Sequence, residues 1–165
     1  MTLYEQTVPV FARMLRNLSV LLEKAEAHAE AAGYDIAALL SARLFPDMFT
    51  LTRQVQLATD FAKGACARLA GDAVPRWEDT EASVADVHAR IRKAIAYVES
   101  FQPAQFDGAA ARRIELKTPG GDFAFAGGDF VTEWALPNFY FHVATAYNLL
   151  RHNGVPLGKL DFLGK

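Results

Sequence analysis

Four segments of this sequence repeat apolar residues at intervals of three and four, and this repeat limits the possible folds more than any other feature. Side chains at that spacing fall on one side of an α-helix, which must then be buried against another element. The first stripe follows the capping pattern of Thr2–Glu5 and predicts a long helix that ends at Gly33. Its members are Phe11, Leu15, Leu18, Leu22, Ala25 and Ala29.

A second stripe lies between Pro46 and Gly71 and is rich in alanine. Pro46 is expected to open this helix, because proline lacks the amide hydrogen that a first helical turn leaves unbonded. The carboxylate of Asp47 suits the positive end of the helix dipole. The alanines would let a partner helix approach closely. The stripe consists of Met48, Leu51, Val55, Ala58, Ala62, Ala65 and Leu69.

Two more stripes predict a third and a fourth helix. The third is expected to start at Thr80 or Ser83, since either hydroxyl can cap a helix, and to stop at Pro103. The fourth follows Asp129, a candidate N-cap, and closes at Asn153. The third stripe contains Val84, Val87, Ile91, Ala94, Val98 and Phe101, and the fourth contains Val131, Ala135, Phe139, Val143, Ala146, Tyr147 and Leu150.

The segment between the third and fourth helices has a different pattern. Two short apolar or alternating runs, Arg113–Lys117 and Phe123–Phe125, flank the turn-forming sequence Thr118–Asp122. This arrangement is typical of a β-hairpin. Four helices with one apolar stripe each are best buried together, so the sequence predicts an all-α four-helix bundle with a short β-hairpin before the last helix, in one domain over residues 1–165.

Composition narrows the class of protein. The chain of 165 residues is 52% hydrophobic and 22% charged, which is typical of a globular protein. A net charge of −2, with basic and acidic residues interleaved, gives no general attraction to nucleic acid or to anionic membranes. No segment is apolar enough to span a membrane and no secretory signal is recognisable, so we expect a soluble, cytoplasmic protein.

The residues with the clearest chemical character are Asn138 and His142, which lie one turn apart at the edge of the apolar face of the fourth helix. Asp47 and Gln54 are seven residues apart and share one face of the second helix. A bundle could bring these four side chains together to bind a divalent metal or a small polar ligand. The alternative is that His142 is a core histidine whose ring is hydrogen-bonded by Asp47 or Asn138.

The remaining histidines and the cysteine are weaker candidates for a functional role. His28 and His88 are expected to face solvent or to lie at the margin of the core, and His152 suits the negative end of its helix. Cys66 has no activating base in its helix and is expected to be an inert packing residue. Neither a cysteine nucleophile nor a phosphate-binding glycine loop is predicted.

Three runs, Arg43–Met48, Pro137–His142 and Leu150–Lys159, resemble a bacterial family of unknown function placed with the DinB/YfiT-like proteins, a superfamily of metalloenzymes. The resemblance covers essentially the whole chain. It implies a four-helix bundle with a short β element before the last helix, and it implies a homodimer.

The DinB-like pattern also implies three metal-binding histidines, one near the start of the second helix and a pair four residues apart in the fourth. His142 matches the second of the pair, because Leu150 follows it at the interval typical of the family. Asn138 occupies the place of its partner. The second helix has no histidine, and Asp47 and Gln54 are its nearest substitutes. The resemblance therefore implies a degenerate metal site, with His142 and Asp47 as the remaining candidate ligands for zinc or nickel.

Three functions are compatible with this sequence. The first is binding of a small polar molecule in the candidate pocket without a tightly held metal. The second is a divalent-metal-dependent transferase or hydrolase acting on a small thiol, as the resemblance to DinB-like thiol transferases implies. The third is a dimeric interaction module that uses aromatic residues such as Trp77 and Phe162 as its contact surface.

Overall fold

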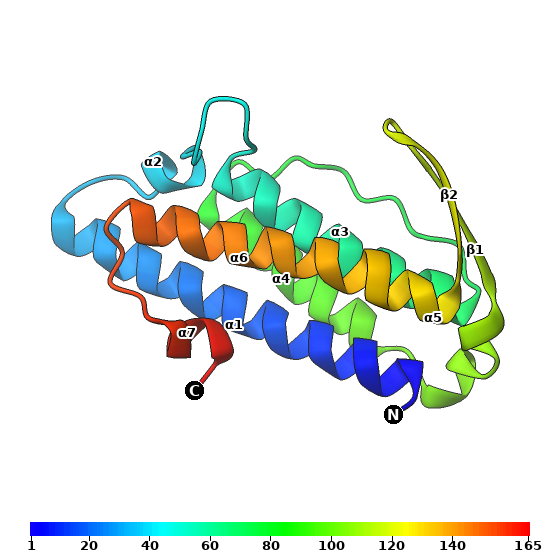
Figure 1. The fold of residues 1–165 in the computed structure, drawn as a ribbon. Helices are drawn as coiled ribbons and strands as arrows, with labels where there is room; N and C mark the ends of the chain where they lie inside the picture. The colour runs from blue at the N-terminus through cyan, green and yellow to red at the C-terminus, as the bar shows by residue number, and fades with distance from the viewer.

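Four long helices form the body of the protein, in a computed structural model that describes residues 1–165 (Figure 1). They are α1 (Leu3–Ala32), α3 (Leu51–Ala70), α4 (Val84–Glu99) and α6 (Leu136–His152). Strands β1 (Arg113–Thr118) and β2 (Gly121–Ala126) pair antiparallel and project from one end of the bundle. The short helices are α2 (Ala37–Leu40), α5 (Gly127–Asp129) and α7 (Lys159–Leu163), with single 3-10 turns at Pro103–Phe106 and Ala109–Ala111. The predicted bundle and hairpin are confirmed.

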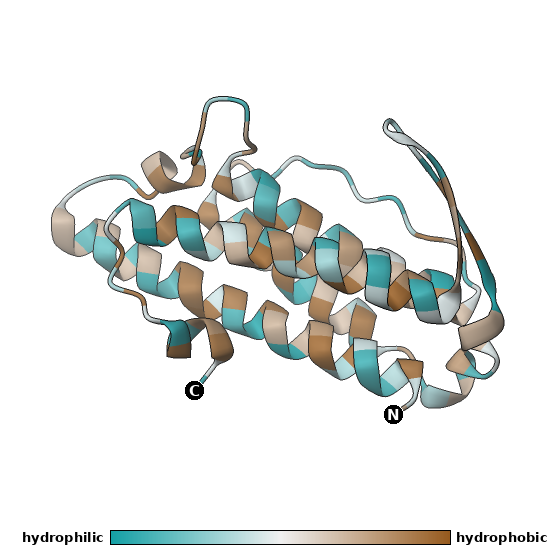
Figure 2. Ribbon diagram, viewed as in Figure 1, coloured by the Kyte–Doolittle hydropathy of each residue, from teal (hydrophilic) through white to brown (hydrophobic).

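The apolar stripes meet in a single core. Helix α6 packs against α3, α1 packs against α4, and α3 also contacts α4 and α1. Figure 2 shows hydrophobic and hydrophilic residues alternating around each long helix, as expected for helices with one buried side. The rings of Phe11 and Phe139 are fully buried and meet edge to face with their centroids 4.8 Å apart. This aromatic pair joins α1 to α6 across the core.

Helix α3 begins later than the sequence predicts. Its N-cap is Thr50, whose hydroxyl accepts a hydrogen bond from the backbone N–H of Arg53. Pro46 and Asp47 lie instead in a turn closed by the hydrogen bond from Met48 N–H to the carbonyl oxygen of Phe45. The prediction that Pro46 opens the helix is therefore wrong, because a hydroxyl cap four residues later satisfies the free amides of the first turn.

The start of the last helix also differs from the prediction. Asp129 does not cap it, because the backbone is already helical from Gly127 and passes through a π-helical segment, Phe130–Ala135, into α6. Pro137 has no N–H to donate to the carbonyl of Glu133, and the wider π-helical turns directly precede this proline. Gly127 lies so close to the carbonyl oxygen of Ala109 that a β-carbon there would overlap it.

A buried arginine fixes the long connector between α3 and α4. The Arg90 side chain is 3% exposed and forms ion pairs with Asp60 on α3 and with Asp79 and Glu81 on the connector. Its Nε also donates a hydrogen bond of 2.8 Å to the hydroxyl of Thr59. Since a buried charge is tolerated only when it is paired and hydrogen-bonded, this network ties the connector firmly to the bundle.

Two aromatic residues expected at a contact surface are half-buried instead. The ammonium groups of Lys63 and Lys93 lie 4.4 Å and 4.5 Å from the ring centroid of Trp77. Phe162 packs on Tyr147 with ring centroids 5.9 Å apart. Both rings are used within the chain, because the connector and the C-terminal segment fold back onto the helices.

His88 does not face solvent. Its ring bridges α4 to α1, with Nδ1 at 3.0 Å from the Ser19 hydroxyl and Nε2 at 2.6 Å from a carboxylate oxygen of Glu26. Cys66 is fully buried, and burial raises the pKa of its thiol, in agreement with an inert packing role.

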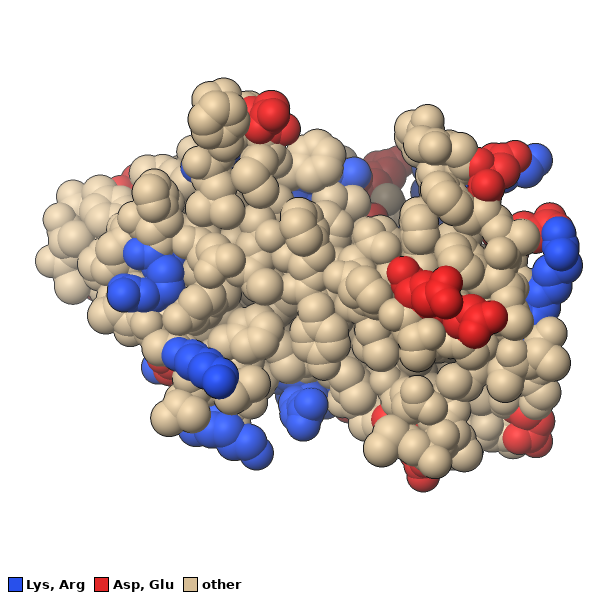
Figure 3. All heavy atoms as spheres, in the orientation of Figure 1, with Lys and Arg blue, Asp and Glu red and all other residues tan.

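The surface around α6 is mostly uncharged (Figure 3). On that face, positive side chains gather toward the α7 end and negative ones toward the hairpin end. None of the helices combines the length and the hydropathy that crossing a bilayer requires.

Candidate functional site

His142 of α6 and Gln54 of α3 form the centre of the site that the sequence predicts. The His142 ring is 7% exposed, and its Nδ1 lies 2.7 Å from Oε1 of Gln54. The Gln54 amide is oriented by a second contact, because its Nε2 donates a hydrogen bond to the carbonyl of Phe49. The two helices thus place an imidazole and a fixed amide oxygen against each other.

This contact determines the protonation state of the ring. An amide oxygen only accepts hydrogen bonds, so Nδ1 of His142 carries the proton and donates it to Gln54. Burial of the ring, assisted by the positive charge of Arg53, lowers the pKa of His142 to about 4. At neutral pH the ring is uncharged, and its Nε2 has a free lone pair.

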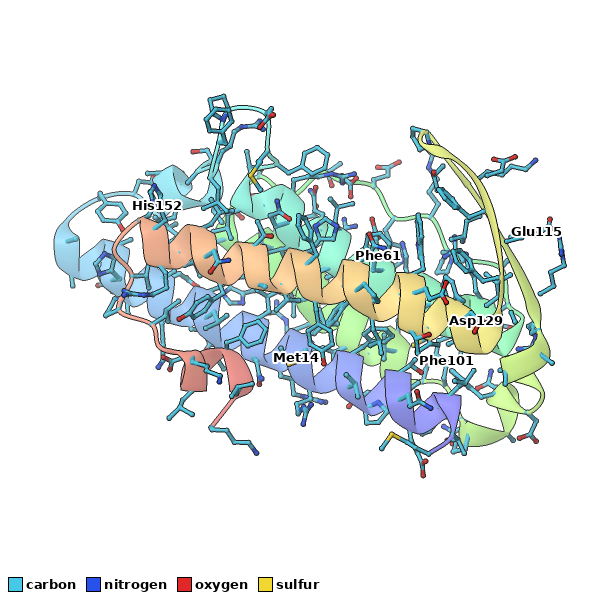
Figure 4. The ribbon with its side chains drawn as sticks, viewed as in Figure 1. Met14, Phe61, Phe101, Glu115, Asp129 and His152 are labelled. Atoms are coloured by element: carbon cyan, nitrogen blue, oxygen red, sulfur yellow. The ribbon has the colours of Figure 1, made fainter.

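Phe61 forms one wall of the site. It lies seven residues after Gln54 on α3, and its ring stacks on His142 with the centroids 5.4 Å apart and the planes 19° apart. Phe61 lies between α3 and α6 (Figure 4). Phe61 was not among the predicted site residues, although an aromatic residue two helical turns from Gln54 on the same face of the helix is a usable signal.

Asn138 lies one turn before His142 on α6 and is half-buried. Its Nδ2 donates a hydrogen bond of 2.8 Å to the carbonyl of Trp134, and its Oδ1 has no partner within the protein. The Nε2 of His142 also has no partner. Tyr34 carries the one fully buried side-chain polar atom that lacks a hydrogen bond. The two free acceptors, Oδ1 of Asn138 and Nε2 of His142, are therefore open to solvent.

Asp47 is not brought into this arrangement. It is exposed in the turn before α3 and makes no hydrogen bond or ion pair. No group of three or more histidine, cysteine, aspartate or glutamate side chains lies close enough together to hold a metal ion. One imidazole and two amides remain, whereas zinc sites use three or four imidazole, thiolate or carboxylate ligands. The residues present do not fit the three-histidine metal site that the DinB resemblance implies.

Comparison with known proteins places this chain in a family. Residues 3–163 match the family described as Domain of unknown function (DUF1993). The chain belongs to this family. None of the curated proteins searched matches the chain.

The fold has a close counterpart in a crystal structure described as a DinB family member protein from Shewanella denitrificans. That protein is 44% identical in sequence and superimposes with a TM-score of 0.92. The match covers 99% of this chain and 92% of that one. The DinB-like resemblance read from the sequence is thus confirmed for the whole fold, including the hairpin that precedes α6.

Proposed function

We propose that this protein binds a small, uncharged polar molecule at the site formed by Gln54, Asn138 and His142, and that it does so without a tightly bound metal. The main support for this proposal is the hydrogen bond between His142 and Gln54. It places the ring proton on Nδ1 and leaves Nε2 as a hydrogen-bond acceptor. Nε2 of His142 and Oδ1 of Asn138 together offer two acceptors one helical turn apart.

The charge around the site supports an uncharged ligand. Arg53 contributes to the lowered pKa of His142 but is itself paired with Asp79. Gln54, Asn138 and His142 carry no negative charge, so they offer a bound ammonium or metal cation no counter-charge. A primary amide, or a molecule with two hydroxyl groups, can donate one hydrogen bond to each acceptor and needs no counter-charge. The stacked ring of Phe61 then covers one side of the bound group.

The test compares metal and neutral ligands on protein purified without an affinity tag. Zinc and nickel titrations by calorimetry should give no stoichiometric binding in the micromolar range. In protein labelled with nitrogen-15 histidine, small alcohols and amides should shift the Nε2 resonance of His142, and His142→Gln should abolish their binding. Micromolar zinc or nickel binding that is lost in His142→Gln contradicts the proposal and supports the metal-dependent alternative. The absence of any response to alcohols and amides contradicts it as well.

We also propose a homodimer. Phe45 and Phe49 before α3 and Phe141 on α6 are 64%, 52% and 56% exposed. The ring of Phe141 meets that of His142 edge to face, and the backbone carbonyl of Phe49 accepts a hydrogen bond from Gln54, so Phe49 and Phe141 lie next to the same site. Exposed aromatics gathered in one region often mark an interface. Sedimentation should show dimers that Phe141→Ser weakens, and a monomer at every concentration contradicts this proposal.

A further inference from the structure

A pocket of about 450 Å³ lies beside α3, next to strand β1 and the π-helical segment that leads into α6. It is open to solvent and is lined by α3 from Leu57 to Arg68, the connector after it, strand β1 and the π-helical segment before α6. Figure 1 shows the connector running along α3 and the hairpin at the end of the bundle. The volume lies within the range of pockets that hold small organic molecules.

The apolar part of this pocket is largely aromatic. Trp77 of the connector, Trp134 of the π-helical segment and Phe61 of α3 all line it. These two tryptophans are the only ones in the chain. Rings of this kind favour a flat apolar body through stacking and edge-to-face contacts.

The polar part is dominated by positive charge. Four basic side chains line the pocket, and Asp60 is its one acidic side chain. Asp60 is already neutralised by Lys63 at 2.7 Å and by Arg90 at 3.0 Å. Arg68, in contrast, forms no ion pair, and its Nη1 donates to the carbonyl of Gly64 in the preceding turn. The pocket therefore has a surplus of cationic donors.

Arg68 is held in place by a glycine. A β-carbon at Gly64 would lie 2.6 Å from Nη1 of Arg68, so the guanidinium occupies the space that the missing side chain leaves. Glycine in the middle of a helix costs about 1 kcal/mol relative to alanine. Gly64 is flanked by alanine-rich sequence, yet alanine is absent at this position. Burial also lowers the pKa of Arg68, although arginine stays protonated in proteins.

We propose that this pocket binds an organic anion with a flat aromatic body, whose acidic group pairs with Arg68 and whose body lies against Trp77 and Trp134. A planar guanidinium matches the two oxygens of a carboxylate, sulfonate or phosphate group. This pocket is separate from the hydrogen-bonding site at His142 and goes beyond it. It uses other residues, and its ligand is an aromatic anion, whereas the ligand at His142 is uncharged and polar. Phe61 is the one residue that borders both.

A matched pair of fluorescent dyes tests this proposal. Anilinonaphthalene sulfonate carries an acidic group, and phenylnaphthylamine is its uncharged parent. Both dyes accept excitation energy from tryptophan, so energy transfer reports binding near the two tryptophans. One sulfonate dye should bind per chain, more tightly than its parent. Arg68→Met should weaken sulfonate binding about tenfold or more and leave the parent dye nearly unchanged, because a charge-assisted hydrogen bond is lost.

Two further variants distinguish the effect of the position of the Arg68 guanidinium from the effect of positive charge in general. Gly64→Ala keeps the charge of Arg68 but displaces its guanidinium, and it should weaken sulfonate binding by a smaller factor than Arg68→Met. Arg13→Met removes one exposed positive charge on α1 outside the pocket, and it should change neither dye. Circular dichroism checks that each variant folds, and Arg68→Gln replaces Arg68→Met if that variant does not. Equal losses in Arg68→Met and Arg13→Met, equal losses of both dyes, or no binding of the sulfonate overturn the proposal.

Discussion

The buried, uncharged state of His142 predicts a specific dependence of stability on pH. The pKa of a free histidine is about 6.5, whereas burial lowers that of His142 to about 4 in the folded protein. Between these values the unfolded chain binds a proton that the folded protein does not. The contribution of His142 to the free energy of unfolding is therefore fully present above pH ~6.5 and is lost as the pH falls toward 4.

The size of the effect follows from the same two pKa values. One pKa unit corresponds to about 1.4 kcal/mol. Between pH ~7.5 and ~4.5, the contribution of His142 to the free energy of unfolding should fall by about 2–3 kcal/mol. His142→Gln removes the titrating ring and keeps a side chain able to hydrogen-bond to Gln54. Other titrating groups act equally in both proteins, so they cancel in the difference between the two unfolding free energies.

Urea unfolding of both proteins across this pH range, with a chelator present, measures that difference. Proton NMR of the imidazole gives the pKa of His142 directly. A difference that stays constant with pH, or a measured pKa near 6.5, refutes the assignment of a buried neutral ring that donates to Gln54.

Two other predictions concern the fold. Arg90→Met should lower the free energy of unfolding by about 3–5 kcal/mol in urea, because it leaves carboxylates on α3 and the connector without their buried partner; a loss below about 1 kcal/mol contradicts the network. Gly127→Ala should destabilise by at least about 2 kcal/mol because its β-carbon overlaps the carbonyl of Ala109. In the neighbouring control Gly128→Ala, the β-carbon meets Ala110 at an ordinary 3.9 Å, so that variant should lose less.

The four-helix bundle could be predicted from the sequence because four helices with one apolar stripe each bury those stripes best by packing them together. The C-cap at Gly33 and the capping box at Thr2 are local motifs, and both are present as predicted. The start of α3 was misplaced because Pro46 and Thr50 are both valid helix openers, and only packing of the preceding turn decides between them. Long-range contacts of this kind are not visible in local sequence.

The candidate site was predicted in part for the same reason. The pairing of Gln54 with His142 required only the faces of two helices, which periodicity supplies. Asp47 was grouped with them because the second helix was predicted to start at Pro46, whereas α3 starts at Leu51. The pocket around Arg68 went unnoticed because the connector that carries Trp77 has no periodicity, and its place over α3 depends on the ion pairs of Arg90.

One row of α3 links the two sites. Gln54, Phe61 and Arg68 recur every seven residues beside the alanine-rich stripe. Gln54 orients the ring of His142, Phe61 supplies an aromatic face, and Arg68 supplies a positive charge. The residues that face them run in the opposite direction, from His142 on α6 back to Trp134 in the π-helical segment before it. None of the three α3 residues needs a metal to act. Under the two proposals above, a chain with the DinB-like fold but without the three histidines of the family pattern would still recognise a polar group beside His142 and an anionic group beside Arg68.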